Sequence, residues 1–356
     1  MGWIDAASRT AGRARYAAGQ GLRAAWYTAQ MQAARRRAEG FNRPDEPRFS
    51  PSRGTPDMAA LRRAYFDLFI QDRLNVEAGL YPAPQDVRLD RLPKALKSAQ
   101  AFLEDVSAVD ARRLARNGTE IRETLPEGSN RYPAYYRQNF HYQSGGWFTD
   151  ESAELYDTQV EALFSGTANA MRRAALAVIA KELRGRDQRS VRLLDVACGN
   201  GLFLETLLGI WPKLNAAGLD LSPSYTDAAR ARLARWPQAE IVHDMAEAMP
   251  LAPASVDIAV SIYLFHELPP KVRPKVLAEI FRILKPGGLF VLADSLQFGD
   301  RPGLDGLLEY FPHGFHEPYY KGYLGWALDE ALTQAGFVKE DGRLAFLTKV
   351  TAWRKP

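Results

Sequence analysis

The order of apolar and polar residues along the chain changes near residue 190. Beyond that point, short runs of branched apolar residues alternate with stretches of helical spacing, which is typical of parallel strands joined by helices. The expected strands are residues 191–197, 216–221, 239–243, 258–263, 288–294, 337–344 and 346–353. The last two are joined by too short a connection for a parallel crossover. The pattern predicts an α/β fold with a seven-stranded, mostly parallel sheet and an antiparallel last strand.

Helical spacing dominates before residue 190. Residues 58–79, residues 89–116 and two stretches between 151 and 185 carry apolar faces that must be buried. Prolines at 44, 47, 51 and 56 predict a linker instead of regular structure. We therefore expect a basic helical arm (1–41), a linker (42–57), a helical region (58–130), an aromatic lid with connecting helices (131–189) and an α/β domain (190–356).

Composition narrows the class of protein. Apolar residues make up 46% of the chain, as in globular proteins, and the formal net charge of +4 is too small to indicate a nucleic-acid binder. Cys198 is the only cysteine, so no intrachain disulfide can form, and a reducing compartment is expected. No apolar run reaches the roughly 18 residues that a membrane-spanning helix needs. These features favour a cytoplasmic protein that is at most peripheral to a membrane.

The positive charge is concentrated in the first 41 residues. Only Asp5 and Glu39 oppose the arginines at positions 9, 13, 15, 23, 35, 36 and 37, and Trp3 and Trp26 lie among them. Three interpretations remain open: an arm packed on the protein, a helix lying on an anionic membrane surface, and an organellar presequence. For the second, we expect binding to anionic vesicles.

Candidate binding chemistry begins at the first expected strand. Gly199 and Gly201 follow it in a turn before a helix, where their backbone can approach a ligand closely. Asp220 ends the second strand, about 20 residues after the turn, which suits an acid that accepts hydrogen bonds from ribose hydroxyls. Leu204 stands where a dinucleotide-binding turn needs a small residue, and it is expected to hold the helix away from the strand. The unit predicts nucleoside binding and disfavours a dinucleotide.

Residues 193–201 resemble the first motif of class I S-adenosylmethionine-dependent methyltransferases, and Ala197 is similar to the ubiquinone/menaquinone C-methyltransferase branch. Four later motifs of that family follow in order, at residues 218–222, 243–245, 256–268 and 284–288. The resemblance covers residues 190–356 and implies a Rossmann-like fold, S-adenosylmethionine as cofactor and methyltransferase activity. It implies that Asp195 lies near the amino-acid end of the cofactor. The implied cofactor-binding residues are Asp195, Ala197, Gly199, Gly201, Asp220, Leu221, Asp244 and Met245.

The candidate catalytic residue is His266, which follows the fourth strand. Its ordinary pKa lies near neutrality, so it could accept a proton from a hydroxyl group or an activated carbon. A contact with substrate or cofactor, or a structural role, would place a histidine there equally well. Cys198 is expected to be buried and not to act as a nucleophile.

Two aromatic clusters, at residues 132–148 and 310–320, are candidates for the acceptor site. The first is expected to form a lid, although it could instead pack the helical region on the domain. The candidate substrate-binding residues are Tyr142, Trp147, Tyr263, His316, Tyr319 and Tyr320. His313 and His316 with Glu317 could imitate a metal site, but a third ligand at a suitable spacing is missing, so no metal is expected.

The sequence therefore predicts a methyltransferase that acts at carbon or oxygen of a small, lipophilic or aromatic acceptor. One alternative is a non-catalytic protein that binds S-adenosylmethionine for assembly or sensing. A nucleic-acid methyltransferase is less favoured, since residues 261–264 lack the Asp/Asn-Pro-Pro-Tyr motif of amino-methylating enzymes. The sequence predicts no oligomeric state.

Overall fold

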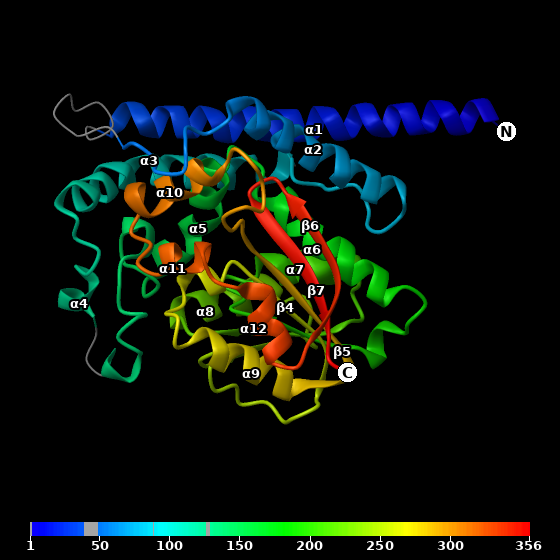
Figure 1. Cartoon of the computed structure of the whole chain (residues 1–356). Helices are drawn as coiled ribbons and strands as arrows, with labels where there is room; N and C mark the ends of the chain where they lie inside the picture. The colour runs from blue at the N-terminus through cyan, green and yellow to red at the C-terminus, as the bar shows by residue number, and fades with distance from the viewer. Residues whose placement is uncertain (1, 39–48, 88, 126–128) are drawn as a thin grey trace.

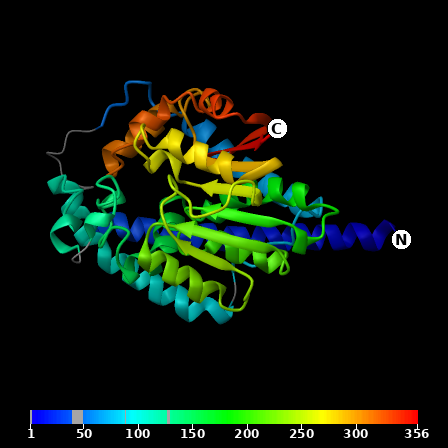
Figure 2. The same ribbon diagram turned by 90° about the horizontal axis from the view of Figure 1, so that it is seen from below.

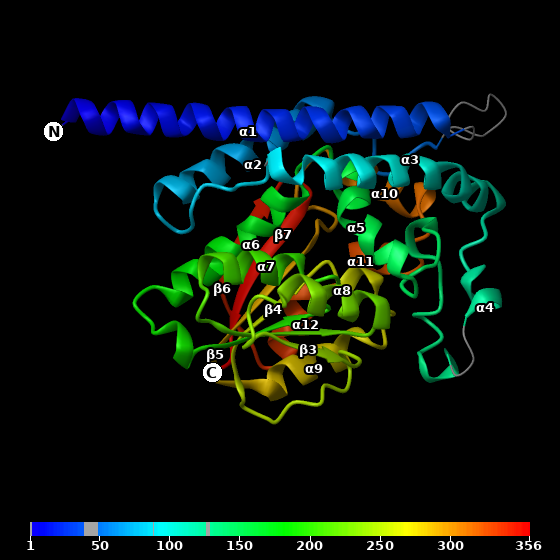
Figure 3. The ribbon, with the colours of Figure 1, turned by 180° about the vertical axis from the view of Figure 1, so that it is seen from behind.

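The computed structural model describes residues 2–38, 49–87, 89–125 and 129–356 (Figure 1). A layer of helices from the first half of the chain lies over one edge of an α/β domain (Figures 1 and 3). Residues 39–41 of the predicted arm, 42–48 of the predicted linker and 126–128 of the predicted helical region lie outside the described residues. Residues 49–57 contain no helix or strand.

The sheet has seven strands in the order β3-β2-β1-β4-β5-β7-β6. Only β7 runs antiparallel to its neighbours, β5 and β6, which confirms the predicted fold class. The largest difference from the expected boundaries is at β5, which begins earlier because Leu284 pairs with Val256 before an irregularity in the register. The strands are β1 (Arg192–Val196), β2 (Asn215–Asp220), β3 (Glu240–His243), β4 (Val256–Ile262), β5 (Leu284–Ser295), β6 (Val338–Ala345) and β7 (Thr348–Arg354).

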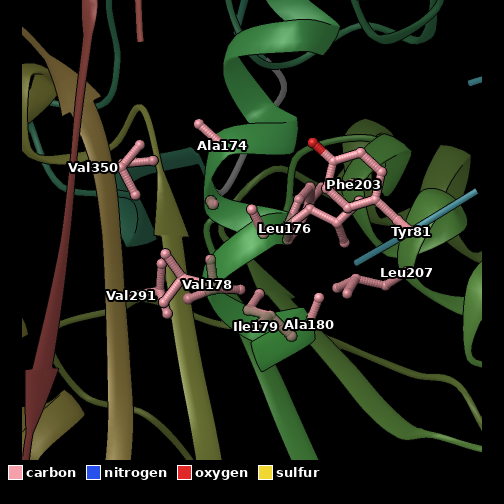
Figure 4. Packing of buried hydrophobic residues seen from close by; sticks show 14 of the residues in the cluster. Tyr81, Ala174, Leu176, Val178, Ile179, Ala180, Phe203, Leu207, Val291 and Val350 are labelled. Carbon is pink, nitrogen blue, oxygen red and sulfur yellow. The ribbon is translucent and has the colours of Figure 1, made fainter. Parts of the chain in front are cut away.

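Helices cover both faces of the sheet, because alternate residues of each buried strand point to opposite sides. Leu193 packs in one apolar cluster with α6 (Ala168–Leu183) and α7 (Leu202–Ile210), whereas Leu194 packs in another with α9 (Arg273–Ile283) and α12 (Leu328–Gln334). Figure 4 shows Val178 of α6 beside Val291 of β5. The two clusters fix the sheet, so the carboxyl ends of its parallel strands form a rigid edge.

The helical layer lies over this edge (Figures 1 and 3). Its main helices are α1 (Gly2–Arg37), α2 (Met58–Glu77), α3 (Leu92–Ala115) and α5 (Asp150–Leu163). Two helices inserted after β5, α10 (Asp305–Gly314) and α11 (Tyr320–Leu324), lie beside them. The remaining α-helices are α4 (Ile121–Thr124) and α8 (Pro223–Leu233).

Helix α1 packs on the protein from Tyr16 onward, in agreement with the first interpretation of the arm, an arm packed on the protein. Tyr16, Gln20, Arg23, Gln30 and Ala34 are buried at a spacing of three to seven residues along one side of the helix. The N-terminal end projects beyond the α/β domain (Figure 2). No helix of the described residues is long and apolar enough to cross a membrane.

Buried ion pairs join the helices of the layer to α6 and to one another. The Arg173 guanidinium lies 2.7 Å from Asp72 of α2 and 2.9 Å from Asp86. Arg23 of α1 lies 2.6 Å from Glu161 of α5. Removing one partner of such a pair leaves an uncompensated buried charge, which costs about 3–5 kcal/mol. The layer is therefore held at a fixed position over the sheet edge.

Candidate active site

The loop after β1 turns sharply before α7. Ala197, Gly199 and Gly201 have positive φ angles of 62°, 55° and 77°. Glycine reaches this left-handed region without strain, whereas an alanine costs roughly 1–2 kcal/mol there. A strained residue that is not glycine is a feature of functional sites.

Asp220 holds this loop in place from the end of β2. Its Oδ2 atom accepts a hydrogen bond from the Gly199 N–H at 2.8 Å, and Oδ1 accepts one from the Ser222 N–H at 2.9 Å. Burial raises the pKa of the Asp220 carboxyl group. Each carboxylate oxygen has two lone pairs, so Asp220 can still accept hydrogen bonds from a ligand.

Asp195 lies on the neighbouring strand, where it is 2% exposed. Burial, followed by the negative charge of Asp220, raises the pKa of Asp195 to about 8. A cation nearby would favour the ionised carboxylate and lower this pKa. Without such a cation, the Asp195 carboxyl group is mostly protonated at neutral pH.

A cleft lies at the carboxyl ends of the central strands. Five of the eight predicted cofactor residues line it, namely Ala197, Gly199, Asp220, Leu221 and Asp244. Asp195, Gly201 and Met245 do not.

Gly201 instead allows α7 to pack on α8, since a Cβ atom there would lie 3.1 Å from Ala229. Met245 is half-buried, and its neighbours Ala246 and Glu247 line the cleft in its place.

The expectation that Leu204 holds the helix away from the sheet is wrong. Leu204 is fully buried against β2, where Gly218 makes room for it. A Cβ atom at Gly218 would lie 2.8 Å from Leu204 Cδ1 and 2.6 Å from Cys198 Sγ. Leu204 therefore does not discriminate between cofactors. Cys198 is buried, and burial raises the pKa of its thiol, which suits a packing residue.

Aromatic residues of the predicted lid cover the cleft. Tyr135, Tyr136, Phe140 and Trp147 line it. Ser222 lies two residues after Asp220, and its hydroxyl donates a hydrogen bond to the Trp147 carbonyl. The lid segment is thus attached to the same turn that positions the Asp220 carboxylate.

A second and larger cavity, of about 720 Å³, lies between the helical layer and the domain. Its walls are mainly apolar side chains from α1, α2, α3, α5 and α10. Tyr156, Tyr263 and Glu267 line both this cavity and the cleft. The two spaces therefore meet at these three residues.

Comparison with known proteins identifies the domain. A methyltransferase-domain family matches residues 193–288. A probable S-adenosylmethionine-dependent methyltransferase of Mycolicibacterium smegmatis is 30% identical over 165 residues, which cover 46% of this chain and 56% of that protein. A ubiquinone/menaquinone biosynthesis C-methyltransferase of Methylobacterium nodulans is 32% identical over 158 residues, which cover 43% of this chain and 59% of that protein. This chain carries a class I S-adenosylmethionine-dependent methyltransferase domain.

The chain spans about half the length of the curated relatives it matches. The family's cofactor is S-adenosylmethionine, and the cleft of the methyltransferase domain fits it. Asp220 lines the cleft and keeps lone pairs that can accept hydrogen bonds from the hydroxyl groups of a bound nucleoside, whereas Asp195 does not line it. The described residues contain no group of three or more His, Cys, Asp or Glu side chains that could hold a metal ion.

His266 lines the large cavity and is 8% exposed. Its Nδ1 atom lies 2.6 Å from Oδ1 of Asp294, near the end of β5. Burial opposes the charge of the imidazolium, but Asp294 outweighs burial and raises the pKa of His266 to about 9. A histidine whose Nδ1 is held by a buried carboxylate can accept a proton at Nε2.

A second histidine and carboxylate pair lies beside this one. His141 Nδ1 is 2.9 Å from Glu317, and His141 Nε2 is 3.5 Å from Glu267, which in turn lies 3.9 Å from His266 Nε2. Burial opposes the charge of His141, but Glu317 and Glu267 raise its pKa to about 10. His141 has a φ of 56°, a further strained residue at the site.

The six predicted substrate-binding residues do not all line the same space. Tyr142, Tyr263 and Tyr320 line the large cavity, whereas Trp147 lines the cofactor cleft. His316 and Tyr319 line neither space, and both form hydrogen bonds with the Gln138 side chain, at 2.9 Å and 3.2 Å. These two residues therefore support the lid segment and do not contact either space.

Sequence reasoning missed four polar residues of the site, which are His141, Glu267, Asp294 and Glu317. Asp294 ends an expected strand at the functional edge of the sheet, and that position could have identified it. Glu267 follows His266 directly. His141 and Glu317 carry no such signal, because only the packing of two distant aromatic clusters brings them together.

Proposed function

We propose that this chain is an S-adenosylmethionine-dependent methyltransferase that modifies carbon or oxygen of a small, lipophilic or aromatic acceptor. One observation carries the proposal: the apolar cavity and the cofactor cleft meet at Tyr156, Tyr263 and Glu267. An acceptor in the cavity would place its head beside the cofactor. The similarity to a quinone-biosynthesis C-methyltransferase is in keeping with such an acceptor.

The cofactor, when bound, supplies an electrophilic methyl group on a sulfonium. The residues of the chain would hold the acceptor in line behind that group and exclude water, which the apolar walls favour. Transfer of that methyl group would break its bond to sulfur as its bond to the acceptor forms, and would leave S-adenosylhomocysteine. The proton lost by the acceptor passes to Nε2 of His266, and Asp294 stabilises the resulting imidazolium.

The proposed cofactor roles follow the predictions, with Asp220 on the ribose, Asp195 near the amino-acid end and Asp244 near the adenine. We further propose that the enzyme is cytoplasmic and contacts a membrane peripherally, because an acceptor that fits an apolar cavity partitions into lipid. Nucleic acid has no part in this proposal.

The test is methyl transfer from radiolabelled S-adenosylmethionine to a panel of quinols, phenols and lipids. We expect at least one labelled product, and we expect His266→Gln to lower the rate by about 10²- to 10⁴-fold without weakening cofactor binding.

The matched control is His313→Gln, because His313 stacks on Phe49 outside both spaces. Equal losses of rate in the two variants would show that His266 does not accept the proton. Saturable cofactor binding with no product from any acceptor would favour the non-catalytic sensor instead.

A further inference from the structure

The acceptor cavity reaches the protein surface between α1, α2 and α10. Three large apolar residues line the cavity and are exposed at the same time: Met58 (61%), Phe66 (56%) and Tyr310 (37%). Met31 of α1 belongs to the same lining. The mouth of the cavity is thus surrounded by exposed apolar side chains.

Helix α2 extends this apolar surface away from the mouth. Ile70 and Leu74 follow Phe66 at intervals of four residues and are 48% and 43% exposed. Residues four apart lie on the same side of a helix, so the three form a row. Isolated exposed apolar residues are common on soluble proteins, but a row that continues the rim of a cavity indicates an interaction site.

The same rim is basic. Arg35 and Arg62 line the mouth and are exposed, and Arg36 and Arg37 follow in the last turn of α1. The carboxylate of Asp105, which also lines the cavity, is occupied by a hydrogen bond from Ser144. Apolar side chains flanked by arginines are the chemistry of a surface that binds anionic lipid.

On the basis of the proposed function, we propose that this face rests on an anionic lipid bilayer and admits the acceptor directly from the lipid into the cavity. We call it the mouth face and define it by Met58, Phe66, Ile70, Leu74, Arg35 and Arg62. The apolar side chains enter the boundary between head groups and acyl chains, while the guanidinium groups stay with the phosphates. The acceptor then never crosses water.

This contact differs from the one expected for the basic arm. The projecting N-terminal end of α1 is not part of the mouth face, and α1 contributes only from its C-terminal third. The bilayer would therefore lie against the cavity entrance rather than against a separate arm.

The test is flotation of the full chain with two kinds of vesicle, one of phosphatidylcholine alone and one with a third of phosphatidylglycerol. No cofactor or acceptor is added, so binding is measured independently of activity. We expect binding to the anionic vesicles that weakens with salt, and at least a tenfold loss in the double variant Phe66→Glu/Ile70→Glu.

The control is Val338→Glu, which places one glutamate at an apolar residue on β6 that is as exposed as Phe66 (56%). Binding that survives in Val338→Glu and is lost in the double variant supports the mouth face. Equal binding by all three proteins overturns the proposal. A wild-type dimer that is absent in the double variant also overturns it, because a second copy of the chain would then cover the face. Methyl transfer to a short-chain, water-soluble acceptor separates the two proposals. If the protein methylates such an acceptor but does not bind vesicles, the mouth-face proposal is rejected and the proposed function stands.

Discussion

The cofactor cleft and the acceptor cavity differ in how the chain builds them. The cleft takes its polar groups from strand ends and turns of one continuous α/β unit, as with Asp220 and the loop that it holds. The cavity takes its walls from helices that are far apart in sequence, from α1 to α10. A binding site for a common cofactor can therefore stay constant while the helical layer above it sets which acceptor enters. Substitutions in the two regions should separate cofactor binding from acceptor use.

The largest expected effect is that of Asp294→Asn, at the boundary between the regions. The wild-type rate should rise tenfold per pH unit up to about 9, because only the neutral form of His266 accepts a proton and its pKa is about 9. The variant loses the charge that raises this pKa, so the midpoint should move down toward the ordinary histidine value near 6.5. The rate on the high-pH plateau should fall by about 10³-fold, since Nε2 becomes less basic and the ring is no longer held.

The measurement is a pH–rate profile with saturating substrates, together with calorimetric titration of the cofactor. Cofactor affinity should stay within about twofold, because Asp294 does not line the cleft. A profile that keeps its midpoint near 9 in the variant would show that another group accepts the proton. Glu267, whose pKa is raised by burial, would then be examined first.

The second largest expected effect is that of Asp220→Asn on cofactor binding. The neutral amide loses charge-assisted hydrogen bonds to the ribose and disturbs the one from Gly199, so affinity for S-adenosylmethionine should fall by about 10- to 100-fold. Asp227→Asn is the control, since its carboxylate on α8 is largely exposed and pairs with Arg230. Calorimetry would measure both, and equal affinities in the two variants would contradict the ribose role.

These differences explain what could be predicted from the sequence. The order of strands and helices, the glycine turn and Asp220 all follow from local patterns, because each is set within about 30 residues of chain. The packing of Leu204 could not be predicted, because it depends on the space that Gly218 leaves on β2. His316 and Tyr319 were misplaced for the same reason: an aromatic cluster predicts burial but does not say which partner, here Gln138, each ring will meet.

A change inside the cavity should spare the cofactor. Val109 of α3 is half-buried in the cavity wall, so Val109→Phe adds volume there. Overpacking costs about 1–3 kcal/mol, so KM for a long-chain acceptor should rise by about tenfold. KM for a short-chain acceptor should change by less than about twofold. Val87→Phe, at an exposed residue (48%) that lines neither space, should leave both KM values unchanged. Equal losses for long and short acceptors would mean that the chain does not lie along α3.

The smallest expected effect is a pH dependence of cofactor binding that arises from Asp195 at the end of β1. In the free protein Asp195 has a pKa of about 8, so it is mostly protonated below that pH. A cationic ligand favours its carboxylate, so binding releases a proton and affinity for S-adenosylmethionine should rise several-fold between pH 5.5 and 7. 5′-Methylthioadenosine lacks the amino-acid end and should bind equally across this range, as should S-adenosylmethionine to Asp195→Asn. A rise that persists in Asp195→Asn would assign the proton to another group, and Asp195 would then not be the residue that selects the charged end of the cofactor.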